Sequence, residues 1–323
     1  MSVQTFDFGK AVFHFFQVAG RRPAAVLWIA LWQALLTAGL VYLTFVTLGD
    51  FYFWAISEAM AGTEPADAEV LARLAGIMSV MPLISIGGIL IALMAQAAWL
   101  RLLTRDEMSA VIPFRIGGDE LRLFVTNLGL IALAVAFYLA AMAVTLVFVG
   151  GLAAAVGNEG SAGAGLAGGF IVALLFLVLA VAAIFIGVRV SAAPAMTVYE
   201  KRIAFPAWQA TRGIFWPVLG AYVLVAIIIA VLSAIVGAVL NLTMLGAFLP
   251  IAGEIVELAQ SNSQPSDEEV MAVLRDAFTH PGVMTSVVAL GLLSVILRSF
   301  SDAIWHSVGA SVAIQRGTAP DTN

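Results

Sequence analysis

Residues 168–188 read GGFIVALLFLVLAVAAIFIGV, and they belong to an uncharged run that extends from 160 to 188. The hydrocarbon core of a bilayer is about 30 Å thick, and an apolar helix of about 20 residues crosses it. Five more uncharged runs of similar or greater length occupy 23–49, 74–100, 123–158, 213–253 and 277–297. The sequence therefore predicts an all-α integral membrane protein with six transmembrane helices.

The composition of the whole chain agrees with this prediction. Of its 323 residues, 62% are hydrophobic and 11% are charged, with a mean hydropathy of +1.04. Soluble domains average about 45–50% apolar and about 25% charged residues. A net charge of -5 argues against a nucleic-acid partner, and the lack of Cys excludes disulfides and thiolate chemistry.

We expect one membrane domain over residues 1–323. The run 213–253 is about 61 Å long as a helix, which exceeds one bilayer crossing. We therefore expect a break near Gly246 to Pro250, with the remainder lying along the outer surface. Ser266 and Glu269 form a capping-box pattern that predicts a further helix in the last outer loop. The six spans are predicted near 24–49, 77–100, 124–150, 164–188, 215–245 and 282–313.

The distribution of basic residues predicts the orientation. With six spans, thirteen of the fifteen Lys and Arg residues lie on the side of the N-terminus, and only Arg73 and Arg275 lie on the other. Short cytoplasmic segments carry the excess of Lys and Arg in membrane proteins. The sequence therefore predicts that both termini are cytoplasmic.

The segment before the first span has the pattern of an amphipathic helix. Phe8, Val12, Phe15, Phe16 and Ala19 share one helical face, with His14 and charged residues opposite. This pattern favours a helix lying on the inner membrane surface, and the alternative is a short helix packed on the bundle. Similar lead-ins before the third and fifth spans predict three repeats, 1–107, 108–202 and 203–323, each a surface helix followed by a two-span hairpin.

Polar residues inside the spans are few, and two sets of them stand out. Arg298, Asp302 and His306 are spaced four residues apart, so they share one face of the last helix. Arg101 and Arg189 occupy places in the second and fourth spans similar to that of Arg298 in the sixth. The three arginines form a candidate site for an anionic lipid headgroup, and the alternative is that each follows the inside charge bias.

One stretch resembles a known family. It comprises Val188-Arg189-Val190-Ser191, Pro194, Glu200, Ala207, Thr211-Arg212-Gly213, Trp216 and Leu219-Gly220. This stretch is similar to the six-span membrane domain that is fused to some glycerophosphodiester phosphodiesterases and that also occurs alone in bacterial inner membranes. The resemblance implies an integral protein of the bacterial inner (plasma) membrane. The catalytic domain of those enzymes is absent from this sequence, so their hydrolase activity is not implied.

These observations favour a non-enzymatic protein that binds membrane lipids or serves as a scaffold for other membrane proteins. The alternative is a transporter or channel whose path is lined by the polar stripe of the last helix together with Glu200. Gln96 is the main polar group inside the second span, and such a residue more often links two helices. No catalytic, metal-binding or cofactor motif is evident, and we expect no cofactor.

Overall fold

The computed structural model describes residues 6–62, 66–109, 112–157, 162–204, 207–260 and 281–317. This part of the chain is almost entirely helical and contains no strand. The predicted capped helix at Ser266 lies outside the described residues. The described helices are α1 (Phe8–Arg21), α2 (Pro23–Ala61), α3 (Asp67–Arg105), α4 (Gly118–Gly157), α5 (Ala162–Val190), α6 (Ala193–Glu200), α7 (Ala207–Ala210), α8 (Phe215–Gln260) and α10 (Pro281–Arg316).

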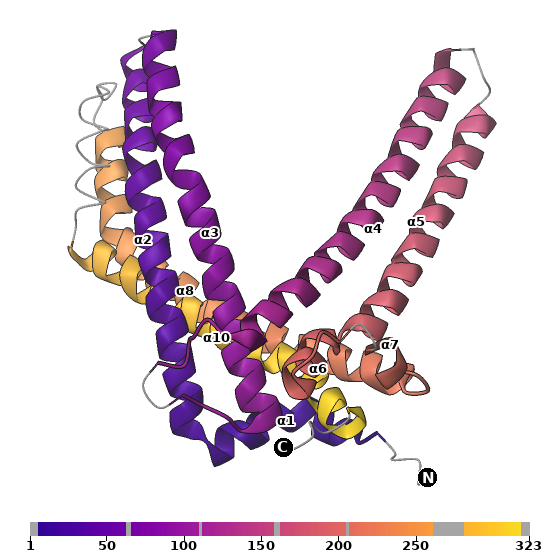
Figure 1. The fold of residues 1–323 in the computed structure, drawn as a ribbon. Coiled ribbons are helices and arrows are strands. Elements are labelled where there is room, and N and C mark those ends of the chain that lie inside the picture. The colour runs from indigo at the N-terminus through magenta and orange to yellow at the C-terminus, as the bar shows by residue number, and fades with distance from the viewer. Residues whose placement is uncertain are drawn as a thin grey trace, which may run out of the picture.

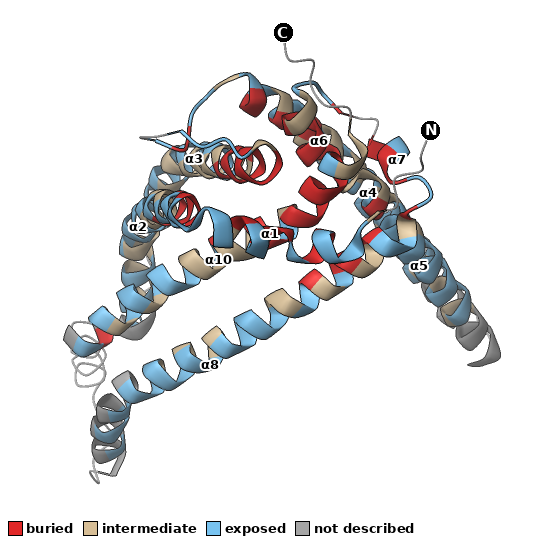
Figure 2. Ribbon diagram, turned by 90° about the horizontal axis from the view of Figure 1, so that it is seen from below, coloured by how far each residue is buried: buried red, intermediate tan, exposed pale blue. Residues whose placement is uncertain are grey.

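The prediction of six spans is confirmed. Within the described residues, six helices are long and apolar enough to cross a membrane: α2, α3, α4, α5, α8 and α10. Consecutive spans pack against one another as the hairpins α2–α3, α4–α5 and α8–α10. The α2–α3 and α4–α5 hairpins diverge from a common base, where both termini lie (Figure 1). Figure 2 shows α8 and α10 extending from the same base, and α10 contacts α1, α2, α3, α6 and α8 there.

Burial is concentrated in this base. The buried residues gather in α1, α6, the early turns of α2 and α8, and the last turns of α3 and α10 (Figure 2). Many of them are alanines, among them Ala97 and Ala98 in α3 and Ala310 and Ala313 in α10. Small side chains let helix backbones approach closely, which is how apolar helices pack in membranes. The halves of the hairpins that lie farther from the base expose apolar surface, as lipid-facing helices do.

The first helix packs on the base, so its buried face differs from the predicted one. Val12 and Phe15 are buried as expected, whereas Phe8 and Phe16 are exposed. His14, predicted on the polar face, is buried and its Nε2 lies 2.8 Å from the carbonyl oxygen of Leu103 in α3. The reason is that α1 contacts α3, α8 and α10 at once, so its buried face is rotated by about one residue from the predicted stripe.

One further expectation differs from the structure. The break near Gly246 to Pro250 is absent, because α8 continues as one helix to Gln260. A continuous helix keeps its backbone groups hydrogen-bonded, whereas a break in apolar surroundings would leave several unpaired. The predicted helix starts before the third and fifth spans have counterparts: α4 begins at Gly118, and the short α7 precedes α8. The division into three repeats stays a prediction.

Candidate functional site

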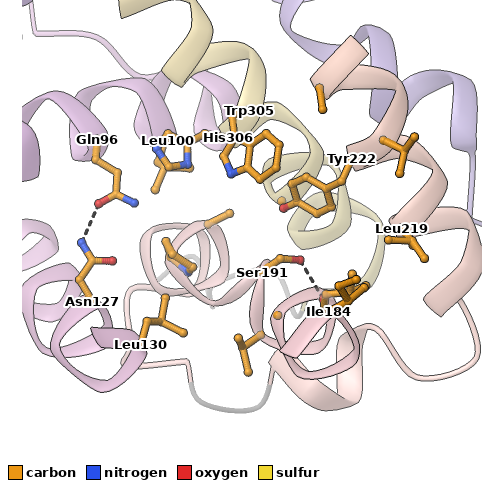
Figure 3. Close-up of a pocket in the computed structure, with 18 residues that line it drawn as sticks. Gln96, Leu100, Asn127, Leu130, Ile184, Ser191, Leu219, Tyr222, Trp305 and His306 are labelled. Atoms are coloured by element: carbon orange, nitrogen blue, oxygen red, sulfur yellow. Dashed lines mark hydrogen bonds between the residues drawn. The ribbon is translucent and has the colours of Figure 1, made fainter. Parts of the chain in front are cut away.

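A cavity of about 640 Å³ lies where the three hairpins converge. Side chains of α3, α4, α5, α6, α8 and α10 line it (Figure 3). Most of the lining is aliphatic, with polar groups contributed by Gln96, Asn127, Ser191, Tyr222 and His306. A mostly apolar cavity with a few converging polar groups is the usual form of a small-molecule site.

Gln96 and Asn127 form one polar pair of the cavity. The Asn127 amide in α4 donates a hydrogen bond to Oε1 of Gln96 in α3, at 2.7 Å (Figure 3). Gln96 thus links two helices, as its sequence context predicts. Each side-chain amide carries more hydrogen-bonding groups than this one bond uses, so both keep capacity for a ligand.

Tyr222 and Trp305 form the opposite wall. Their ring centroids are 4.9 Å apart, which joins α8 to α10. Gly309 lies one turn beyond Trp305 and lets the backbone of α10 approach the backbone at Ser191. A Cβ at this position would lie 3.2 Å from the Ser191 carbonyl oxygen and 3.4 Å from the Tyr222 hydroxyl. The hydroxyl of Ser191 donates to the carbonyl of Val188 at 2.8 Å.

His306 is the one cavity residue that also belongs to the predicted polar stripe. Its imidazole lines the cavity, and no described residue accepts from it or donates to it. The lining residues Ile184 in α5 and Val223 in α8 are 53% and 51% exposed. The cavity therefore opens between α5 and α8, onto surfaces that are apolar along both helices.

The structure does not bring the three predicted arginines together. Arg101 is buried in α3, where its guanidinium pairs with Glu120 of α4 and donates to the carbonyl oxygen of Pro113 at 3.2 Å. Arg298 is exposed and pairs with Asp302 at 3.0 Å. Arg189 lies near the C-terminal end of α5, beside the aromatic rings of Phe185 and Trp208. Arg101 is a link between the first two hairpins, which leaves it unsuited to a shared headgroup site.

The polar stripe is divided in the same way. Arg298 and Asp302 pair with each other, whereas His306 turns into the cavity. Glu200 pairs with Arg202 at 2.7 Å. Tyr199, the residue before Glu200, lies against Gly317. Gly317 follows His306 by eleven residues, which corresponds to about 16 Å along the axis of α10, so Glu200 is far from His306. These four groups do not gather along one path within the described part of the chain.

Several polar contacts of the base are absent from the sequence predictions. Gln33 of α2 accepts hydrogen bonds from Trp99 Nε1 at 2.9 Å and from the Ser299 hydroxyl at 2.6 Å. This contact joins the first hairpin to α10. The sequence feature that could have predicted these contacts is a lone polar residue in an apolar run, such as Gln33 or Asn127. Such residues usually form hydrogen bonds with other helices.

Among the described residues, no three His, Asp or Glu side chains form a cluster that could hold a metal ion. The cavity lining offers one imidazole and two amides, which is a hydrogen-bonding set. The resemblance to the phosphodiesterase-linked membrane domain stays a prediction. No family model matches this chain, and neither the curated proteins nor the solved structures include a significant match.

Proposed function

We propose that this membrane protein binds a lipid, and that the cavity between the hairpins holds the polar end of one lipid molecule. The observation that carries the proposal is an apolar cavity with converging hydrogen-bonding groups that opens between two apolar helices. A ligand can enter it from the bilayer without crossing water. Its volume of about 640 Å³ suits a headgroup and the start of a chain, with the rest of the chain lying along α5 and α8.

The lining favours an uncharged headgroup. None of the described residues that line the cavity is an Asp, Glu, Lys or Arg. A charge placed there would lose its water without gaining an ionic partner, which is costly in an apolar site. Hydroxyl, ester or amide groups would instead find donors and acceptors on Gln96, Asn127, Tyr222 and His306. The site therefore favours a neutral amphiphile over an anionic phospholipid.

The sequence supports a specific placement in the cell. We propose a bacterial inner membrane with the base and both termini on the cytoplasmic side, since thirteen of fifteen basic residues fall there. In this orientation the cavity lies toward the inner leaflet. Its ligand would then come from lipids of that leaflet.

Two matched variants test the lipid site. A Cβ at Gly187, which lines the cavity, meets nothing within 4 Å, so Gly187→Phe fills the space without a clash at the backbone. Gly291 in α10 is equally open and lies on an exposed face outside the cavity lining. Each protein would be extracted in native lipid particles and its bound lipids identified by native mass spectrometry.

We expect the wild type and Gly291→Phe to retain the same neutral lipid, and Gly187→Phe to lose it. Retention of that lipid by Gly187→Phe at the wild-type level would contradict the proposal. Retention of anionic lipid alone by the wild type would contradict the proposed headgroup class.

A further inference from the structure

Arg189 is half-buried, and its environment is unlike that of Arg101 and Arg105. Its guanidinium carbon lies 5.2 Å from the ring centre of Phe185 and 5.5 Å from that of Trp208. Arg101 and Arg105, by contrast, each contact a carboxylate. Among the described residues no carboxylate pairs with Arg189. Its positive charge is therefore held by aromatic faces alone.

The hydrogen-bonding groups of Arg189 are incompletely used. Nε and Nη1 are enclosed and have no acceptor among the described residues. An aromatic face attracts the cation but does not accept these N–H groups in the guanidinium plane. An arginine that only extended its charge toward water would expose its nitrogens. Here two nitrogens are enclosed and unpaired, so the site lacks an acceptor that a ligand could supply.

The neighbouring residues add a second cation and an aromatic rim. The Thr211 hydroxyl donates to the Arg189 carbonyl oxygen at 3.2 Å, and the next residue, Arg212, is exposed. Trp208 and Trp216 are 42% and 76% exposed, and Trp side chains favour the membrane–water interface. Because tryptophans favour this interface, we expect Arg189 and Arg212 to lie near the depth of the lipid phosphate groups.

We propose that Arg189 binds a phosphate group, with Arg212 as a second cationic contact and Trp208 as the aromatic cover. A guanidinium offers a planar fork of N–H donors that matches two phosphate oxygens. The phosphate supplies the missing acceptors when Trp208 moves aside to admit it. The phosphate source is either a phospholipid headgroup or free inorganic phosphate.

This site is separate from the cavity and does not depend on the function proposed for it. Ile184 and Gly187 of α5 line the cavity, whereas Arg189 is rotated around the helix by about 140° from Ile184 and about 160° from Gly187. Its neighbours Val188 and Val190 also line the cavity, but Arg189 itself does not. A protein that binds no neutral lipid in the cavity could still bind phosphate at Arg189.

The test compares Arg189→Gln with Arg298→Gln, a control that removes an exposed, ion-paired arginine. Each protein is placed in phosphatidylcholine nanodiscs containing a minor fraction of phosphatidylglycerol. Native mass spectrometry then counts the phosphatidylglycerol retained, with and without millimolar inorganic phosphate. Arg212→Gln serves as a second variant, since an exposed side chain is replaced without disturbing the packed base.

We expect Arg189→Gln to weaken phosphatidylglycerol retention about tenfold, the effect of losing one charge-assisted contact. Arg212→Gln should weaken it less, and Arg298→Gln should match the wild type. Retention that resists inorganic phosphate identifies the lipid headgroup as the source, and displacement by phosphate identifies the free anion. Unchanged retention in both Arg189→Gln and Arg212→Gln would overturn the proposal.

Discussion

The buried ion pair between Arg101 and Glu120 gives the sharpest prediction about stability. The pair joins α3 to α4, and the two side chains are 4% and 2% exposed. We consider Glu120→Leu, Arg101→Met and the double variant that carries both changes. The single variants leave a charge or a set of polar atoms without its partner, whereas the double variant leaves an apolar contact.

The expected free energies follow from burial. Removing one partner of a buried ion pair costs about 3–5 kcal/mol, because the remaining charge is enclosed and uncompensated. In the double variant the charges are gone, and the main loss is the 3.2 Å hydrogen bond from Arg101 to the Pro113 carbonyl, about 1 kcal/mol. The double variant should therefore be more stable than Glu120→Leu alone by about 2 kcal/mol or more.

The measurement is the free energy of unfolding of the purified protein, from titration with sodium dodecyl sulfate followed by circular dichroism. Glu69→Gln is the control, because Glu69 pairs with Arg73 at 3.1 Å on an exposed surface of α3. That change should cost less than about 0.5 kcal/mol. A double variant less stable than Glu120→Leu would refute the reasoning, as would a Glu120→Leu protein with wild-type stability.

Burial lowers the pKa of His14 below its ordinary value of 6.5, so the unfolded chain binds a proton more readily than the folded one. The contribution of neutral His14 to the free energy of unfolding should be fully present above pH 6.5, and it should fall below that pH by up to about 1.4 kcal/mol per pH unit. Thermal melts at a series of pH values should show this loss in the wild type and lack it in His14→Gln. Gly309→Val should lower the melting temperature, because its Cβ would lie 3.2 Å from the Ser191 carbonyl oxygen, and a melting temperature equal to that of the wild type would refute the close approach. The chain contains no Cys, so a single introduced cysteine can report the side of the membrane on which it lies. A membrane-impermeant maleimide added outside intact cells should label Asp67→Cys and should not label Gly20→Cys. Labelling of Gly20→Cys alone would show that the orientation is the reverse of the proposed one.

The six spans could be predicted from the sequence because the length and hydrophobicity of each run are properties of the run itself. The same information could not show how each span is rotated about its axis. Within α5, for example, apolar residues occupy every face, so periodicity identifies no preferred face for Ile184 or Arg189. The convergence of Arg101, Arg189 and Arg298 was therefore a prediction from position along the spans, and in the structure each of the three has its own separate partners.

Local rules also failed where tertiary contacts decide the outcome. His14 follows the polar pattern of α1, yet its contact with Leu103 draws it into the base. A glycine and a proline near 246–250 suggested a break, yet α8 continues through them. The cavity was likewise beyond the sequence, because its polar groups come from five separate segments. Gln96 and His306 were recognised individually, but nothing in their spacing brings them together.

The most direct test of the proposed lipid site is a cryo-EM map of the protein in nanodiscs formed from its own membrane. We predict elongated density that enters between Ile184 of α5 and Val223 of α8 and ends beside His306 and Asn127. A map at side-chain resolution in which the cavity is empty, or in which α5 and α8 close over it, would contradict the proposal that the protein binds a lipid there.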